Sequence, residues 1–459
     1  MRTQLQPATL ERGALSPLDL LIAGMSYMAP GFSLFFTTAI IASLAGIYIP
    51  LTYLFAGIGV LCTGAALSEF SRLAPSAGSL QTFVGRGFGT NASIIAGVVL
   101  LVGYLCLQAG VAVLFGGWAA AVLAEFTGIV IPWQPITILG VLLFTVLMVR
   151  GVQLSIRATW VLFLTEFIIV LLVALGTLVV GGDSGLTAAP VNFLALDGGS
   201  LGAIALGMVF ATFSFVGFEG AISFAEETPD PRRALPIAVI GGIVAMVALY
   251  VLATYATVIG FGVANIEAVA SDPEPIRTLA ARFTGPLVPF LQIAILTSLG
   301  ANLMAAGNAN ARILFNLGRM RAVPAALGTV HTAFKTPYVA IIAFMLATLV
   351  PGLVASLAWD YLTAFGYIAG FGALLALVVY MVSTVALPFH VRRDGLPMRI
   401  IAHVIVPTIG LAVWLIPLWG ALQPGQSFPF DLYPALAVVV ILAATMYAFI
   451  VNRSGTVDR

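Results

Sequence analysis

The sequence predicts an all-α polytopic membrane protein of twelve transmembrane helices, built as two inverted repeats of five helices with two helices appended. Three observations predict this fold. The chain is 61% hydrophobic and only 8% charged, whereas soluble domains carry roughly 25% charged residues. Apolar runs of about 20 residues recur along the chain, and each can cross about 30 Å of hydrocarbon. Two of these runs are interrupted near their middles, at corresponding places.

The expected helices are the apolar runs that lie between polar or Gly/Pro-rich breaks. They cover residues 17–44, 47–70, 92–124, 132–150, 157–181, 200–225, 236–262, 283–317, 337–357, 360–386, 400–420 and 431–452. The N-terminal stretch is polar and lacks a small-residue cleavage site, so the first run is expected to stay in the mature protein. We expect a single transmembrane domain over 17–452, with tails at 1–16 and 453–459.

Lysine and arginine residues are divided unequally between alternate loops. One set of loops carries seventeen of them, and the other carries only Arg277 and Arg282. Because Lys- and Arg-rich loops stay in the cytoplasm, both tails of this multi-pass protein of the cell membrane are expected to be cytoplasmic. The seventeen residues are Arg2, Arg12, Arg72, Arg86, Arg150, Arg157, Arg232, Arg233, Arg312, Arg319, Arg321, Lys335, Arg392, Arg393, Arg399, Arg453 and Arg459.

The first expected helix contains Met28-Ala29-Pro30-Gly31 near its middle. Pro30 lacks a backbone N–H, and Gly31 tolerates backbone angles that a helix does not use. Broken backbone at membrane depth is tolerated only where protein or a cavity satisfies its polar groups. A packing kink is the alternative interpretation for this helix taken alone, because proline is common in membrane helices.

A second break is expected in the sixth helix, at TFSFVGFEGA (212–221), where Gly217 and Gly220 bracket Glu219. Two interruptions five helices apart are typical of inverted-repeat transporters. The repeats would be 17–181 and 200–386, followed by two appended helices over 400–452. The N-terminal end of a half-helix attracts an electron-rich group such as a carboxylate, and the C-terminal end attracts an ammonium. The breaks are therefore expected to form a binding site.

Three further stretches resemble a known family, the amino acid–polyamine–organocation transporters. They are FATFSFVGFEGAISFAEETPDPRRALPIAV (210–239), LSEFSRLAPSAGS (67–79), and ARILFNLGRMRAVP followed by TPYVAI (311–324, 336–341). The positions that match the family are Glu69, Pro75, Ala77, Gly78, Ala225, Glu226, Glu227, Pro229, Arg232 or Arg233, Pro236, Ala238, Arg312, Arg319, Pro324 and Pro337. The resemblance implies the five-plus-five fold and secondary transport of amino acids or organic cations. The proline in the first break resembles a subset that includes putrescine importers.

Carboxylates at membrane depth are costly and are therefore functional candidates. Glu219 is expected to pair with a substrate amine or to carry a coupling proton; the alternative is that it caps loose N–H groups of the broken helix. Glu166, in the fifth helix, is the second candidate for proton coupling, with a packing role as its alternative. Glu69 is expected to pair with loop arginines near Arg72.

A cytoplasmic gate of ion pairs is expected after the sixth helix, and a solvated loop is the alternative. Its candidates are Glu69, Glu226, Glu227, Arg232 and Arg233. The expected substrate-binding residues lie near the middles of four helices, although core packing is the alternative for any single phenylalanine. They are Tyr27, Met28, Ala29, Pro30, Gly31, Ser33, Tyr104, Gln108, Phe213, Ser214, Phe215, Gly217, Phe218, Glu219 and Asn302.

Other kinds of chemistry are not indicated. Cys62 and Cys106 lie in apolar runs, so neither a disulfide nor a metal site is expected. No cofactor, catalytic constellation or nucleic-acid surface is predicted, and GRGFG (85–89) is expected to be a turn before the third helix. The sequence predicts an importer of a small amino acid, proton-coupled, that works by alternating access in the lipid bilayer. Import or exchange of a polyamine or monoamine is the alternative.

Overall fold

The computed structural model describes residues 10–73, 76, 78–423 and 425–453, and every regular element within them is helical. The α-helices are α1 (Pro17–Met28), α2 (Pro30–Ala45), α3 (Ile49–Leu73), α4 (Ser79–Phe88), α5 (Thr90–Thr127), α6 (Trp133–Val149), α7 (Val152–Val180), α8 (Gly198–Phe213), α9 (Pro231–Phe261), α10 (Ile266–Ser271), α11 (Pro275–Phe283), α12 (Val288–Arg319), α13 (Tyr338–Ala355), α14 (Tyr361–Arg393), α15 (Val406–Ala421) and α16 (Tyr433–Arg453). The shorter helical segments are η1 (Gly46–Tyr48), η2 (Ala189–Val191), η3 (Phe193–Ala195), η4 (Gly220–Glu227), η5 (Val263–Asn265), η6 (Gly285–Leu287), η7 (Ala325–Gly328), η8 (Ile401–Ile405) and η9 (Phe430–Leu432).

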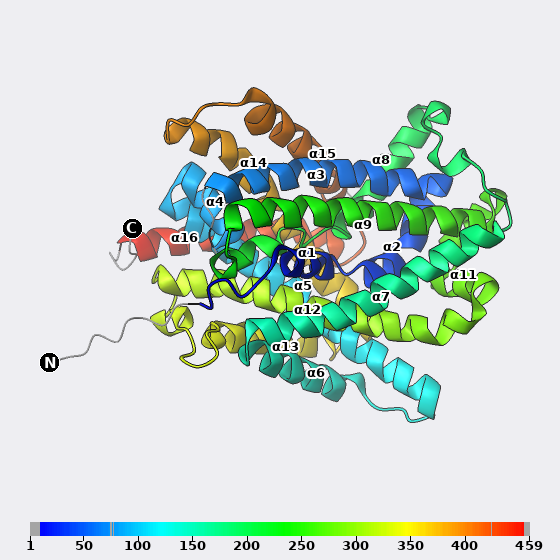
Figure 1. Ribbon diagram of the computed structural model, residues 1–459, viewed down its shortest axis with the longest axis horizontal. Helices are drawn as coiled ribbons and strands as arrows, with labels where there is room; N and C mark the ends of the chain where they lie inside the picture. Colours follow the sequence, from blue (N-terminus) through cyan, green and yellow to red (C-terminus); the bar gives the residue numbers. More distant parts are fainter. Residues whose placement is uncertain (1–9, 74–75, 77, 424, 454–459) are drawn as a thin grey trace.

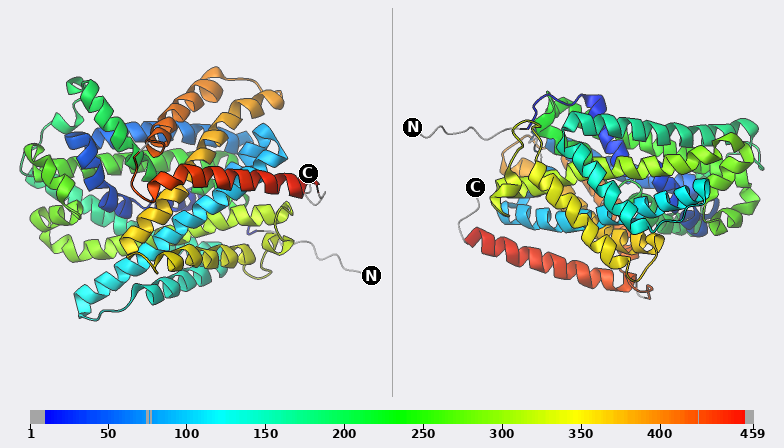
Figure 2. Two further views of the ribbon diagram at one scale, coloured as in Figure 1. Left: turned by 180° about the vertical axis from the view of Figure 1, so that it is seen from behind. Right: turned by 90° about the horizontal axis from the view of Figure 1, so that it is seen from below.

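The long helices lie side by side along one axis, which is horizontal in Figure 1. The most extensive packing is between α14 and α5, α3 and α9, and α12 and α7. The broken helix lies inside the bundle, since α1 packs against α7, α9 and α12, and α2 packs against α8. By contrast, α16 (red in Figure 2) lies on the outer face and buries few of its side chains.

The lengths and composition of the helices fit a lipid bilayer. Nine helical runs of the described chain are long and apolar enough to cross a membrane, and one of them, Pro17–Leu73, contains α1, α2 and α3. Trp133–Val149 and Gly198–Phe213 are shorter apolar helices. Large apolar side chains such as Val179 and Val350 face outward, as lipid contact requires. The chain is therefore a multi-pass membrane protein.

Polar side chains set where several helices begin. Ser16 and Asp19 form a capping box at the start of α1. Asp197 accepts a hydrogen bond from the backbone N–H of Ser200 at the start of α8, and Asp360 caps α14 in the same way. Such side chains satisfy backbone N–H groups that have no partner inside the helix.

The observed helices follow the expected runs, and the run 200–225 is divided at the expected second break, between α8 and η4. There are two differences. The helix of the run 283–317 begins later than expected, because α11 ends at Phe283 and Pro286 and Pro289 mark the entry to α12. The sequence predicted a turn at GRGFG, and this prediction is wrong. Residues 79–88 form α4, and only Gly89 leaves the helix.

The two ends of the bundle differ in charge. We call the end that carries Arg72, Arg150, Arg232, Arg319 and Arg453 the arginine end, and the described chain begins and ends there, on the left in Figure 1. At the opposite end, the two expected arginines are paired with acids, in Arg277–Glu125, Arg277–Glu274 and Arg282–Asp183. Arg2, Pro75, Ala77, Arg459 and the tail residues 1–9 and 454–459 lie outside the described residues.

Candidate functional site

The first break falls at Ala29, between α1 and α2. Ala29 has a φ of 45°, in the left-handed region, and Pro30 then starts α2. The next two backbone N–H groups have side-chain partners from other helices. Gly31 N–H donates to Glu166 Oε2 of α7 at 3.0 Å, and Phe32 N–H donates to Ser298 Oγ of α12 at 3.2 Å. The positive end of the half-helix is thus already occupied by a carboxylate and a hydroxyl.

Gly31 has a different role from the one that the sequence suggested. Its backbone is helical, and Ala29 instead adopts the unusual conformation. A Cβ atom at Gly31 would lie 2.8 Å from Glu166 Oε2. Glycine is required here because a side chain would push the Glu166 carboxylate away from the amide. Oε1 of the same carboxylate is buried and has no hydrogen-bond partner in the described part of the chain.

The second break lies between Phe213, where α8 ends, and Gly220, where η4 begins. Gly217 has a φ of 99°, which glycine adopts without strain. The freed backbone groups are held by tyrosine hydroxyls. Tyr250 donates to the Ser214 carbonyl at 2.8 Å, and the Gly217 N–H donates to the Tyr380 hydroxyl at 3.2 Å. Hydroxyls from α9 and α14 thus replace the helix's own hydrogen bonds.

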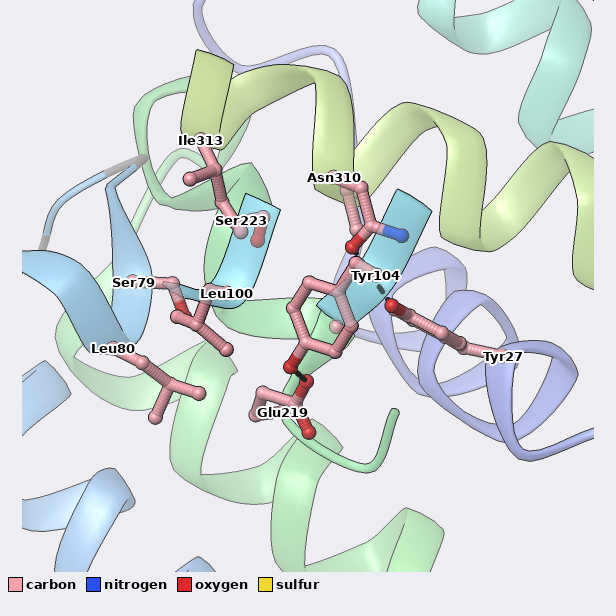
Figure 3. A pocket seen from close by; sticks show the side chains of 11 residues that line it. Tyr27, Ser79, Leu80, Leu100, Tyr104, Glu219, Ser223, Asn310 and Ile313 are labelled. Atoms are coloured by element: carbon pink, nitrogen blue, oxygen red, sulfur yellow. Dashed lines mark hydrogen bonds between the residues drawn. The ribbon is translucent and has the colours of Figure 1, made fainter. Parts of the chain in front are cut away.

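Glu219 is buried directly after this break, with 3% of its surface exposed. It accepts hydrogen bonds from the Tyr104 hydroxyl, drawn as a dashed line in Figure 3, and from the Tyr380 hydroxyl at 2.9 Å. The three side chains come from η4's N-cap, α5 and α14. A buried carboxylate needs such donors, because burial without partners is costly.

Tyr27 of α1 fills the space between the two breaks. Its ring lies against Gly217 and Gly220, where a Cβ atom would collide with it. Its hydroxyl donates to Asn310 Oδ1 at 2.7 Å, and its carbonyl accepts from Asn302 Nδ2 at 2.6 Å. Two asparagines of α12 therefore hold the last turn of α1 (Figure 3 shows the first of them).

A cavity of about 300 Å³ reaches both breaks from the end opposite the arginine end. Ile40, Phe365 and Phe430 line its outer part, and the described residues that line it include no charged side chain. Its volume is within the usual range for small-molecule sites. Seven of the expected binding residues line it: Tyr27, Met28, Ser33, Gln108, Phe213, Ser214 and Asn302.

A smaller pocket, of about 10 Å³, lies on the arginine side of the same region. Tyr104 and Glu219 line it together with Ser79, Ser223 and Asn310 (Figure 3). Tyr27 lines both the large cavity and this small pocket. We call these the large cavity and the small pocket below.

The remaining expected binding residues line neither space: Ala29, Pro30, Gly31, Phe215, Gly217 and Phe218. The first three and Gly217 form the breaks themselves. Phe215 packs on the rings of Tyr53 and Tyr250, and Phe218 packs on Tyr380. These two phenylalanines support the tyrosines that hold the second break.

The expected gate acids form ion pairs, but with arginines of α12. Glu227 and Arg312 make two hydrogen bonds, at 2.8 and 2.6 Å, and both side chains are fully buried. Glu226 and Arg319 pair at 2.7 Å and are partly exposed.

Two other gate candidates, Arg232 and Arg233, lie exposed in the first turn of α9, and neither forms an ion pair within the described residues. Glu69 forms an ion pair with Arg399, and its Oε2 lies 3.8 Å from Arg72, as expected for a carboxylate that pairs with loop arginines. His403 Nε2 lies 3.4 Å from Glu69 Oε1.

Several residues that contact the breaks or the gate acids were missed from the sequence: Tyr250, Tyr380, Ser298, Asn310 and Arg312 as the partner of Glu227. The available signal was polar side chains inside apolar runs. Asn302, Asn308, Asn310 and Arg312 follow one another in α12, and all are buried. Such groups need partners at membrane depth, but a sequence does not say which helix supplies them.

The buried breaks, the cavity between helices and the apolar exterior define a class of protein, the multi-pass membrane transporters. Residues 20–423 match the family model described as amino acid permease. The chain belongs to the amino acid permease family. The family consists of permeases, so the protein is a transporter and not an enzyme.

The names of similar proteins give different transported substrates. The chain is 27% identical to the low-affinity putrescine importer of Escherichia coli K12, over 95% of this chain and 94% of the relative. It is 26% identical to a branched-chain amino acid permease of Bacillus subtilis, over 71% of each chain. A methylthioribose transporter of Bacillus subtilis is 22% identical over 87% of each.

Proposed function

We propose that the protein is a proton-coupled secondary transporter that imports a neutral amino acid by alternating access around the two breaks. One observation carries this proposal: the large cavity reaches Met28 and Ser33 at the first break and Ser214 at the second. Its neutral lining suits a substrate without net charge, because an ion without an opposite charge is costly to bury. The substrate-binding residues in this proposal are those named for the breaks and the large cavity, together with Tyr104 and Glu219.

The proposed architecture has twelve spans in one transporter domain over 17–452. Counting Pro17–Leu73 as two crossings and adding the two shorter apolar helices brings the nine runs to twelve. The repeats in this proposal are 17–181 and 200–386, with two helices appended over 400–452. One break in each repeat supports this division.

The proposed orientation places the arginine end and both tails in the cytoplasm of the cell. The segregation of lysine and arginine supports it. The large cavity then faces the outside, and the ion pairs Glu227–Arg312 and Glu226–Arg319 close the cytoplasmic side together with Glu69. Arg232 and Arg233 stay candidate members of this gate, for a conformation in which η4 moves.

Glu166 and Glu219 are the proposed proton carriers. The Glu166 carboxylate accepts the hydrogen bond of the Gly31 N–H, which is a group suited to bind a substrate carboxylate. Protonation of Glu166 weakens its hold on that amide, since a charged acceptor forms the stronger hydrogen bond. The substrate carboxylate then takes its place. Glu219 carries its proton between the tyrosines of the second break.

Import of an amine is the second candidate. Two observations favour it: Tyr27 lines both the large cavity and the small pocket that Glu219 lines, and a putrescine importer is similar over nearly the whole chain. A cation that displaced Tyr27 would reach a carboxylate already held by two hydroxyls.

Uptake of radiolabelled substrate into proteoliposomes tests both candidates. The vesicles hold purified protein and an inward proton gradient, and unlabelled amino acids and amines compete. We expect neutral amino acids to compete best and a protonophore to abolish accumulation. Competition by putrescine or a monoamine alone would support the second candidate. Absence of uptake with any substrate, gradient or counter-substrate would refute transport as proposed.

A further inference from the structure

The small pocket has features of a water site between Glu219 and the arginine end. Ser79, at the start of α4, lies on its far side from Glu219 with Leu100 drawn between the two, and Ser223 of η4 and Asn310 of α12 line another part of its wall (Figure 3). The volume of about 10 Å³ is close to what one water molecule needs. The pocket is therefore large enough for water and too small for an amino acid.

Polar atoms in the wall lack protein partners. Ser79 Oγ is buried, and it has no hydrogen-bond partner within the described residues. Ser223 Oγ and Asn310 Nδ2 have no protein hydrogen bond there either, since Asn310 uses Oδ1 for Tyr27. Buried polar groups are nearly always satisfied. A water in the pocket can make two to four hydrogen bonds, and these polar groups of the wall are available as its partners.

The conformation of Ser79 points the same way. Its φ of 45° places a residue other than glycine in the left-handed region. Such strain costs about 1–3 kcal/mol and is concentrated at functional sites. Here the strained residue is one that lines the small pocket.

The groups that face Glu219 are all neutral. They are Tyr27 from α1, Tyr104 from α5 and Tyr380 from α14, and the described pocket wall adds no charged side chain. The ring of Tyr27 separates Glu219 from the large cavity. The small pocket thus lies next to Glu219 on the side of the arginine end.

We propose that the small pocket binds a water molecule that carries the coupling proton between Glu219 and the arginine end. The proposal rests on the proposed function. The proton leaves the Glu219 carboxyl for the water oxygen, and the water gives one of its protons to solvent at the arginine end. The carboxylate that forms keeps its hydrogen bonds from Tyr104 and Tyr380. Ser79 and Ser223 are positioning residues for the water.

Two variants of equal size at Ser223 provide the main test. Ser223→Val fills the pocket with methyl groups, whereas Ser223→Thr adds the same bulk and keeps the hydroxyl. We expect Val to slow net proton-driven uptake about tenfold relative to Thr, in the range that a lost proton-transfer group costs. Substrate exchange at equal pH on both sides needs no net proton transfer, so it should differ by less than about twofold between them.

A second pair removes a hydroxyl inside or outside the pocket. Ser79→Ala should slow net uptake and lower its solvent isotope effect. Ser68→Ala, which removes another buried hydroxyl without a partner, should change neither. Equal uptake by the Val and Thr variants, or equal behaviour of the two Ala variants, would overturn the water route while wild-type transport stands. Wild-type protein that accumulates substrate without a proton gradient would instead refute the proposed coupling.

Discussion

The two helix breaks satisfy their freed backbone groups with different partners. The first break exposes backbone N–H groups, and acceptors from α7 and α12 bind them. The second break exposes a carbonyl at Ser214, and the hydroxyl of Tyr250 from α9 donates to it. The second break also carries its own carboxylate, Glu219, whereas the first borrows that of Glu166. The difference matches the opposite ends of the half-helix dipoles.

At neither break are the backbone groups named above left without a hydrogen-bond partner. Each amide or carbonyl named above already has a partner inside the protein. Binding is then an exchange of partners, with a cost for each bond that is broken and a gain for each that replaces it. Such exchange can couple substrate binding to protonation. At the first break the displaced partner is the acid Glu166, and at the second break the partner Tyr380 also donates to the acid Glu219.

The largest expected effect concerns how the second break is anchored to α12. Arg312→Met would leave Glu227 buried without its partner, which typically costs about 3–5 kcal/mol. Arg319→Met is the matched control, because its pair with Glu226 is partly exposed and such pairs contribute about 0–1 kcal/mol. Thermal unfolding of purified protein in detergent measures both. Similar losses of stability in the two variants would contradict the burial argument.

The second expected effect tests the carboxylate that the second break carries itself. Glu219→Gln keeps the shape but removes the charge that accepts from Tyr104 and Tyr380. A hydrogen bond to a charged group is worth about 1.5–3 kcal/mol, so proton-driven uptake should fall about 100-fold, since 1.4 kcal/mol is a factor of ten. Glu267→Gln, at an exposed acid of α10, is the control for expression and folding. Uptake within a few-fold of wild type would remove Glu219 from the cycle.

The sequence predicted much of this comparison. The positions of both breaks follow from glycine and proline in apolar runs, and the structure confirms them at Ala29 and at 214–219. The runs themselves were predictable because crossing a bilayer forces long apolar helices. Neither inference needs knowledge of which helices touch.

The partners of the breaks were not predictable in the same way. Gly31 was interpreted through its backbone freedom, but its role is to leave space for Glu166, which lies 135 residues further along the chain. Glu226 and Glu227 were expected in a gate whose candidate arginines were Arg232 and Arg233, and α12 supplies their arginines instead. Both differences arise from packing between helices that are distant in the sequence. A single sequence does not indicate which of its helices contact one another.

The third expected effect tests the carboxylate that the first break borrows. Glu166→Gln keeps an oxygen that accepts from the Gly31 N–H, but it does not take up a proton. We expect net proton-driven uptake to fall about tenfold while substrate exchange persists, because the amide stays capped and only its proton-dependent release is lost. Glu166→Ala gives the contrast: it leaves the Gly31 N–H without an acceptor, so exchange should suffer too. Unchanged net uptake in Glu166→Gln would leave coupling to Glu219 alone.

The smallest expected effect concerns Tyr250, the hydroxyl that touches both breaks. It donates to the Ser214 carbonyl at 2.8 Å and lies 3.4 Å from the Met28 carbonyl. Tyr250→Phe removes one neutral hydrogen bond, worth about 1 kcal/mol, so the KM for uptake should rise about fivefold with little change in maximal rate.

Tyr255→Phe is the matched control for this variant, since Tyr255 is on the same helix and donates to the Thr187 carbonyl, also at 2.8 Å, away from both breaks. An equal rise of KM in both variants would mean that α9 acts through general stability. A rise in Tyr250→Phe alone would mean that the two carbonyl ends are tuned together by one hydroxyl. The breaks would then respond to substrate as a coupled pair, although different helices supply their other partners.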